Sequence, residues 1–469
     1  MHSTLHSTLH RILPLIIVAA MLLGACSPEI TLITRQPAST PTTESPSGQS
    51  TATPAPTRTP SPSPTPGLRL NPDVVKGLEV EAWVSGDIPG LGQLAADFNG
   101  SNPWDVKISL VSYPNLNLLA GAVSASLESD SRPDVVLALP EQLLGWSESL
   151  LDLAPYAANA EFGVARDAIP PVFWEQSLVD GVQYGLPALR SGRYLFYNVT
   201  WARKLGFETA PQTWDDFREQ ACAANATWKA DADPTNDGFG GLALEVTSNW
   251  QTPYGWVRAL GGEVFAESVY TFENEQNAAA LEKLVDLRAE GCAWLPSTLT
   301  NFEHLAARKA LFVSGGLGDL TDQRAAFSAA ESADEWTVIA FPGETPVVPV
   351  YGLDVAVFQS DLGQELASWL FVQWLLKPEN QARLARASGL FPVSNAAFEL
   401  LKSDYTANPQ KGAAAGLLAQ AVGYPQSAQW GLANKVLADG FLYLFQAFPN
   451  ASAEAVLGQM DATVKDVGE

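Results

Sequence analysis

Residues Trp174–Phe217 decide how this chain folds, and they read WEQSLVDGVQYGLPALRSGRYLFYNVTWARKLGFETAPQTWDDF. Val182–Pro187 has the pattern of a short strand that ends at a proline, and Tyr194–Asn198 has that of a second, apolar strand. Between them, Ala188–Arg193 is polar and too irregular for a helix or a strand. Two buried strands joined by a flexible polar segment indicate a hinge between two globular lobes.

Strands and helices alternate before this segment. Strand patterns lie at 78–84, 106–111 and 133–139, and amphipathic helix patterns lie at 88–99 and 116–127. The alternation predicts an α/β lobe built on parallel strands. Ligands bind such lobes beyond the carboxyl ends of the strands. Binding residues are therefore expected at 83–87 and 138–141.

The N-terminus has the pattern of a lipoprotein signal peptide. Arg11 precedes an apolar run, Ile12–Leu23, that is too short to span a bilayer comfortably. Gly24, Ala25 and Cys26 follow it and resemble a bacterial lipobox. We expect residues 1–25 to be removed and Cys26 to carry a diacylglyceryl group and further acyl chains such as palmitate. The alternative is a buried cysteine after an apolar helix.

Residues 26–70 contain a long stretch, 36–66, that is almost entirely Pro, Ser, Thr and small residues. Such a composition buries little apolar surface and favours extended, disordered chain. Its place after Cys26 predicts a tether that holds the globular part away from a membrane. We therefore expect a lipid-anchored protein on the extracytoplasmic face of the cell membrane.

Length and charge exclude several classes of function. The chain has 469 residues, more than one domain usually needs, and a formal net charge of −24. So acidic a surface repels the phosphate backbone of nucleic acids and anionic lipid. We expect a soluble exported domain and no nucleic-acid partner.

Histidine and cysteine counts narrow the chemistry further. His2, His6 and His10 belong to the expected signal peptide, which leaves His304 as a solvated helix residue. Histidine is the usual general base and metal ligand, so we expect no Ser/His/Asp hydrolysis, no histidine-rich zinc site, no catalytic residue and no cofactor. In an oxidising compartment, Cys222 and Cys292 favour a disulfide over two free thiols.

The segment Asp231–Gly241 has oxygen-bearing side chains at alternating positions before a glycine, like the first half of a calcium loop. The bidentate acid that such a loop needs is missing, because Glu245 comes one residue late. The sequence favours a tight polar turn over a calcium site, and we expect no metal.

Seven segments carry a resemblance to a known family. They are RPDVV (132–136), DGVQYGLP (180–187), LFYN (195–198), KLGFETAPQTWDDF (204–217), LGGEVF (260–265), ARKALFVSGG (307–316) and ASWLFVQWLLKPENQARLARASGLFPV (367–393). With the lipobox, they resemble the extracellular solute-binding proteins of ABC importers, in the branch that contains the maltose-binding protein. The resemblance covers nearly all of 78–400 in the same order.

The resemblance implies a fold and its division. The expected fold is α/β, of the two-lobe periplasmic-binding-protein type (type II), with a cleft and a hinge between the lobes. The N-terminal lobe would comprise 78–187 and 353–390, and the C-terminal lobe 194–350 and 393–469. Three segments would cross between the lobes, at 188–193, 351–353 and 389–392.

The resemblance also implies a function. The chain would be a monomer that captures a small solute, a sugar or oligosaccharide, and delivers it to the permease subunits of an ABC transporter, without catalysis. One alternative is a secreted carbohydrate-active enzyme that uses a pair of carboxylates. Another is the binding subunit of a surface sensor.

Ligand-binding residues follow from the positions of the family's binding loops and of the hinge. They are Trp83, Asp87, Glu141, Arg190, Ser191, Trp250, Tyr254, Gly315, Gly316, Tyr351 and Trp430.

Several of these residues also have a structural interpretation. Trp83 fits a core position, Asp87 a helix cap, and Glu141 the start of a solvated helix. Arg190 fits an ion pair with a carboxylate, and Tyr351 fits packing at the hinge.

Two positions depart from the family's pattern. Ala138 and Leu317 stand where the family places aromatic residues that stack on sugars. This argues against a maltose-like ligand.

Overall fold

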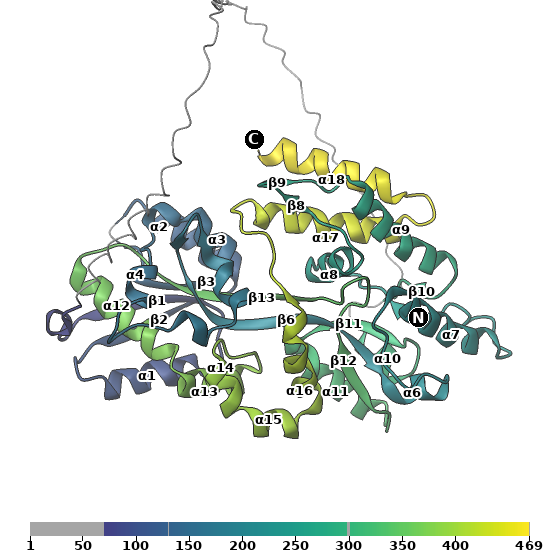
Figure 1. Ribbon diagram of the computed structural model, residues 1–469, viewed down its shortest axis with the longest axis horizontal. Coiled ribbons are helices and arrows are strands. Elements are labelled where there is room, and N and C mark those ends of the chain that lie inside the picture. Colours follow the sequence, from purple (N-terminus) through teal and green to yellow (C-terminus); the bar gives the residue numbers. More distant parts are fainter. Residues whose placement is uncertain (1–69, 130, 298–300, 469) are drawn as a thin grey trace, which may run out of the picture. The chain divides into compact units, whose positions relative to one another are not determined.

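The computed structural model describes residues 70–129, 131–297 and 301–468 (Figure 1). The expected signal peptide, Cys26 and the tether up to residue 69 lie outside these ranges. Within them, every helix is too short or too polar to cross a membrane.

One mixed sheet runs through the described residues. Along its main path the strand order is β10-β7-β11-β6-β13-β3-β1-β2, with β12 paired to β6 and β14 paired to β13. The strands are β1 (Glu79–Ser85), β2 (Lys107–Tyr113), β3 (Val135–Ala138), β6 (Leu186–Asn198), β7 (Leu242–Ala243), β10 (Ala293–Trp294), β11 (Phe312–Gly316), β12 (Trp336–Ile339), β13 (Val348–Val357) and β14 (Ala421–Val422). As expected, β1 pairs in parallel with both β2 and β3.

Two short hairpins lie outside this sheet. They are β4 (Leu178–Val179) with β5 (Val182–Gln183), and β8 (Phe265–Ala266) with β9 (Val269–Tyr270).

Helices fill the sequence between the strands. Before β6 they are α1 (Leu91–Ser101), α2 (Leu116–Ser126), α3 (Pro140–Gly145), α4 (Ala154–Ala157) and α5 (Pro171–Trp174). Between β6 and β13 they are α6 (Val199–Lys204), α7 (Trp214–Lys229), α8 (Gln251–Ala259), α9 (Glu275–Ala289), α10 (Phe302–Ala306) and α11 (Leu320–Ala329). After β13 they are α12 (Leu362–Leu375), α13 (Pro378–Ser388), α14 (Asn395–Leu400), α15 (Lys402–Ala407), α16 (Pro409–Gly416), α17 (Trp430–Gln446) and α18 (Ala453–Gly468).

The prediction of an irregular link at Ala188–Arg193 was wrong. These residues lie inside β6, a continuous strand that is buried along its whole length. The first half of β6 pairs with β13, and the second half pairs with β11 and β12. The polar side chains that suggested a loop are compatible with a buried strand because Arg190 and Arg193 each meet a carboxylate.

The three segments expected to cross between lobes lie beside one another. Residues 350–353 of β13 pair with 189–192 of β6. An isolated bridge joins Arg190 to Phe391, just after Gly389, the C-cap residue of α13. Gly389 has φ of 78°, a left-handed conformation that glycine adopts without strain.

Local sequence signals set several helix boundaries. Thr213 and Asp216 form the expected capping box at the start of α7, since each side chain accepts the other residue's backbone N–H. Asp361 caps α12 by accepting two backbone N–H groups. The core of α12 includes Trp369, which has no exposed surface. Burying a large apolar side chain of this kind stabilises a fold by about 1.5–3 kcal/mol.

The predicted disulfide is confirmed. Cys222 of α7 is bonded to Cys292, which immediately precedes β10. The two cysteines are 70 residues apart in the sequence. Their bond joins α7 to the start of β10, the strand at one end of the main path of the sheet.

Candidate functional site

Six aromatic side chains meet beside β13, and we call them the aromatic cluster: Trp250, Tyr254, Tyr270, Tyr351, Tyr424 and Trp430. Trp250 precedes α8, and Trp430 is the first residue of α17. Their ring centroids are 5.0 Å apart in an edge-to-face arrangement. Tyr424 stacks on Trp430 at 5.6 Å. Four members were predicted from the sequence, and Tyr270 and Tyr424 were not.

The indole N–H of Trp430 is an unsatisfied polar group within the cluster. The Trp430 side chain has no exposed surface, and its indole N–H finds no acceptor within the described part of the chain. A buried donor without a partner costs about 1–3 kcal/mol. A hydrogen-bond acceptor placed here would recover that energy.

Glu141 brings a carboxylate to the cluster. It lies in the first turn of α3 and is only 8% exposed. Its Oε2 accepts a hydrogen bond of 3.0 Å from the Tyr424 hydroxyl, and none of the described residues forms an ion pair with it. Burial raises the pKa of Glu141, and this effect is partly opposed by hydrogen bonds from its backbone and from Tyr424. The bond joins α3 to the segment before α17, which are far apart in sequence.

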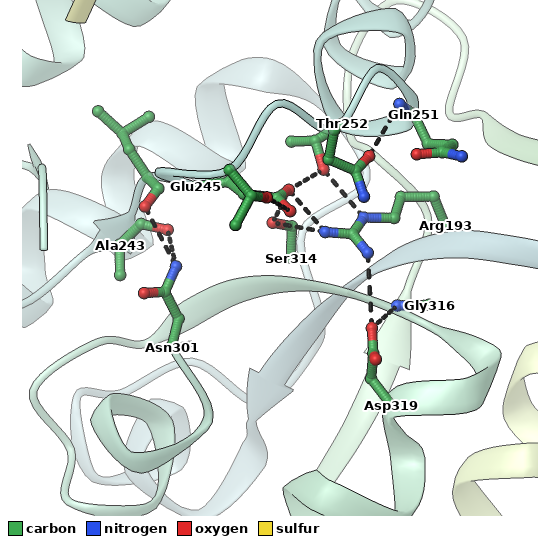
Figure 2. Close-up of polar contacts among 12 residues, drawn as sticks. Arg193, Ala243, Glu245, Gln251, Thr252, Asn301, Ser314, Gly316 and Asp319 are labelled. Atoms are coloured by element: carbon green, nitrogen blue, oxygen red, sulfur yellow. Dashed lines mark hydrogen bonds and ion pairs between the residues drawn. The ribbon is translucent and has the colours of Figure 1, made fainter. Parts of the chain in front are cut away.

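A network of polar side chains surrounds Arg193 of β6 (Figure 2). Its guanidinium donates to Glu245 Oε2 at 2.6 Å and to Thr252 Oγ1 at 2.9 Å. Ser314 and Thr252 also donate to the same carboxylate oxygen. Glu245 therefore neutralises the charge of the buried arginine, and hydrogen bonds with Thr252 and Ser314 hold the pair in place.

These contacts, which we call the Arg193 network, hold α8 and β11 in place. Both elements carry residues that were predicted to bind the ligand. Thr252 lies in the first turn of α8, next to Trp250. Asp319 lies 3.5 Å from Arg193 and accepts the Gly316 backbone N–H at 2.7 Å. Sequence patterns did not single out Arg193, because its acidic partners are 52 and 126 residues away.

Gly315 and Gly316 lie in β11, beneath Phe196 and Tyr351 respectively. A Cβ atom at Gly316 would come within 2.7 Å of the Tyr351 hydroxyl. Glycine is needed here because a side chain would displace a member of the aromatic cluster.

Arg190 lies in the interior with no exposed surface, and its predicted alternative, an ion pair with a carboxylate, is confirmed. Its Nη2 is 2.5 Å from Asp354 Oδ1, and the guanidinium also donates to the carbonyls of Phe173 and Leu353. Burial raises the pKa of Asp354, and the charge of Arg190 opposes this rise. Ser191, also buried, is paired in register with Tyr351.

Trp83 and Asp87 lie at the end of β1. Trp83 belongs to a core cluster with Val136 and Ala138, and its indole N–H donates to Glu81 at 2.6 Å. Asp87 is exposed, and it does not cap α1, whose N-cap residue is Gly90.

The residues that depart from the family's pattern are both buried. Ala138 ends β3 with no exposed surface, and Leu317 is 2% exposed. Neither position offers an aromatic face.

The segment Asp231–Gly241 folds as a turn held by its own side chains. Asp231 accepts the Asp233 backbone N–H and an amide hydrogen of Asn236, and Asp233 accepts from Thr235. His304, expected to be solvated, is instead half-buried against Trp294, and burial lowers its pKa.

Comparison with known proteins identifies a family. The family model described as bacterial extracellular solute-binding protein matches residues 93–414. A putative binding protein of Brucella abortus (strain 2308) is 25% identical over 305 residues, which cover 62% of this chain and 71% of that protein.

Solved structures share the fold at lower sequence identity. The sugar-binding protein MalE of Xanthomonas citri has a TM-score of 0.72 at 18% identity, covering 83% of this chain and 97% of that one. The cyclic α-maltosyl-1,6-maltose binding protein of Arthrobacter globiformis has 0.68 at 20%, covering 83% and 98%. UgpB of Mycobacterium tuberculosis, in complex with glycerophosphocholine, has 0.66 at 17%, covering 83% and 98%. The expected two-lobe α/β fold is confirmed.

Proposed function

Because this chain belongs to the bacterial extracellular solute-binding proteins, we propose that it captures a sugar or oligosaccharide between two lobes and delivers it to an ABC transporter permease. The aromatic cluster with Glu141 at its edge is the observation that carries this proposal. Binding sites for small ligands combine apolar and aromatic walls with a few placed polar groups.

The chemistry of the cluster suits a pyranose. Aromatic faces pack against the C–H face of the ring, as Trp250 and Tyr424 are placed to do. The Glu141 carboxylate can accept a ligand hydroxyl, and the unpaired Trp430 N–H can donate to a ligand oxygen. A buried carboxylate and an unpaired buried N–H are both unfavourable in a core that excludes water. Both can form hydrogen bonds with the hydroxyl groups of a polyol.

The two lobes of the proposal are residues 78–187 with 353–390, and 194–350 with 393–469. The Glu141–Tyr424 bond then joins one lobe to the other. A ligand that binds both sides would favour the closed arrangement by its differential contacts. The rings already touch one another in this structure, so we infer that a sugar enters while the lobes are apart, displaces some of these ring contacts, and is then enclosed as the lobes close.

The chain belongs to an extracellular family, and we further propose attachment to the membrane through lipidated Cys26, a monomeric state and no catalysis. The family and its solved relatives are binding proteins. Mass spectrometry of the detergent-extracted protein tests the attachment: an N-terminal peptide that begins at residue 26 without a diacylglyceryl group would disprove it.

Thermal unfolding with a panel of monosaccharides and oligosaccharides tests the binding function. We expect at least one saccharide to raise the unfolding temperature saturably. Trp430→Ala should abolish the rise, since it removes the unpaired N–H and the ring on which Tyr424 stacks. Tyr443→Ala, a change at a 59% exposed aromatic residue of the same helix, should preserve it.

If no saccharide in a broad panel shifts the unfolding temperature, the carbohydrate proposal is wrong. Turnover of aryl glycosides by the purified protein would instead support a secreted enzyme.

A further inference from the structure

A cavity of about 430 Å³ lies among α11, α13, α15 and α16, away from the aromatic cluster. Its lining includes three cationic side chains, Arg324, Arg386 and Lys411, and one carboxylate, Asp404. None of the six members of the aromatic cluster lines it. Figure 1 shows α11, α13, α15 and α16 on one side of β6 and β13, whereas α8 and α17 lie on the other.

The single carboxylate is already neutralised. Arg386 Nε and Nη2 donate to the two oxygens of Asp404, each at 3.1 Å. The Asp404 pKa is lowered, chiefly by this hydrogen bonding. The pair contributes no free negative charge to the cavity.

The other two cations have neutral partners. Lys411 Nζ donates to the Ala385 carbonyl at 3.2 Å, and Arg324 Nη2 donates to Thr321 Oγ1 at 3.3 Å. Neither forms an ion pair with any described residue. Arg324 and Lys411 therefore share a cavity whose single carboxylate, Asp404, is already hydrogen-bonded by Arg386.

These two cations also act on each other. Lys411 is half-buried, and its pKa is lowered first by burial and further by the charge of Arg324, while Asp404 opposes the fall. Bringing like charges together at a partly desolvated position is unfavourable unless an anion compensates them.

We propose that this cavity binds a small oxyanion, a phosphate group, between Arg324 and Lys411. Arginine and lysine are the side chains that recognise phosphate oxygens. The hydroxyl groups of Thr321 and Ser388 also line the cavity and can donate to the remaining oxygens. Four residues with donor groups, from three helices, line the same cavity, and a phosphate group has oxygens enough to accept from several of them.

The phosphate group has two sources, a free anion and the headgroup of a phospholipid. The cavity is recessed between helices, and the free anion is the ligand that we assign. Its binding would draw α11 and α16 toward the C-terminus of α13, next to Gly389.

Titration of the purified full-length protein with inorganic phosphate at low ionic strength tests the site. We expect a saturable rise in the unfolding temperature and saturable heat on calorimetric titration. Arg324→Gln and Lys411→Met should each weaken the affinity about tenfold, the value of one charge-assisted hydrogen bond. Lys435→Gln removes the same charge from an exposed position of α17 and should change nothing.

A second readout separates binding from structure. Without phosphate, Lys411→Met should unfold at the same or a higher temperature than the natural protein, because a repelled, half-buried charge is removed. A marked loss of stability would assign Lys411 a structural role and overturn the proposal, as would a phosphate response that both variants retain.

Flotation with vesicles, using a Cys26→Ser variant that lacks the proposed lipid anchor, distinguishes the sources. Binding to phosphatidylglycerol but not phosphatidylcholine vesicles, lost in Arg324→Gln, would support the phosphate site and assign it to a lipid headgroup. A response to inorganic phosphate alone would support the free anion. No response to either would disprove the site.

Discussion

Glu141 is a buried carboxylate whose neighbours carry no compensating charge. The Tyr424 hydroxyl donates to it, and Asp354 adds a repelling negative charge. The pKa of Glu141 therefore lies above its ordinary value of 4.5, mainly because of burial. Such a group is suited to exchange a protein hydroxyl for a ligand hydroxyl, because both are donors to the same oxygen.

The sign of the pKa shift gives a pH dependence. A carboxyl whose pKa is raised on folding stabilises the protein fully below its unfolded pKa, and this contribution is lost as the pH rises through the folded pKa. Glu141→Gln keeps an acceptor for Tyr424 without the charge. We expect the variant to unfold at a higher temperature than the natural protein at pH 7, and the difference to shrink toward a pH of about 4.5, the ordinary pKa of the group.

Differential scanning calorimetry across this pH range checks the prediction, with Glu148→Gln, an exposed residue shortly after α3, as the control. If Glu141→Gln is less stable than the natural protein at pH 7, the charge itself holds the fold together and the prediction is wrong.

Four of the six residues of the aromatic cluster were predicted from the sequence, and their role in ligand binding stays a prediction. Trp250, Tyr254, Tyr351 and Trp430 lie together as the positions of the family's binding loops and of the hinge suggested. Tyr424 was missed because it stands in a short segment without a motif, between β14 and α17. Arg193 was missed because a charged side chain in an apolar strand resembles a loop until its distant partners are known.

At the scale of elements, β6 is the feature on which both halves of the sheet depend. It pairs with β13 before Arg193 and with β11 and β12 after it. Sequence patterns predicted two strands here, separated by an irregular link at 188–193. A buried ion pair such as Arg190–Asp354 places charged residues inside a strand, and the pattern of a loop is the same.

The Arg190–Asp354 pair makes a prediction at this scale. Asp354→Asn leaves the Arg190 charge buried without its partner, which should lower the free energy of unfolding by about 3–5 kcal/mol. Glu335→Gln breaks the exposed pair with Arg203 and should cost no more than about 1 kcal/mol. Urea unfolding measures both.

Equal effects of the two substitutions would contradict the account of β6, because burial would then make no difference to the strength of an ion pair.

At the scale of the whole molecule, the fold could be predicted because seven family-like segments occur in the right order. The alternation of strands and helices alone predicted the parallel strands around β1. What it could not supply is the contact between segments far apart in the chain. Glu141 and Tyr424 are 283 residues apart, and their hydrogen bond joins the two proposed lobes.

The central claim is that a saccharide binds between these lobes and draws them together. Small-angle X-ray scattering of the purified protein, with and without the saccharide that most raises its unfolding temperature, tests it most directly. The account predicts a smaller radius of gyration with the saccharide bound, and no change for Trp430→Ala. Saturable saccharide binding with an unchanged radius of gyration would contradict it.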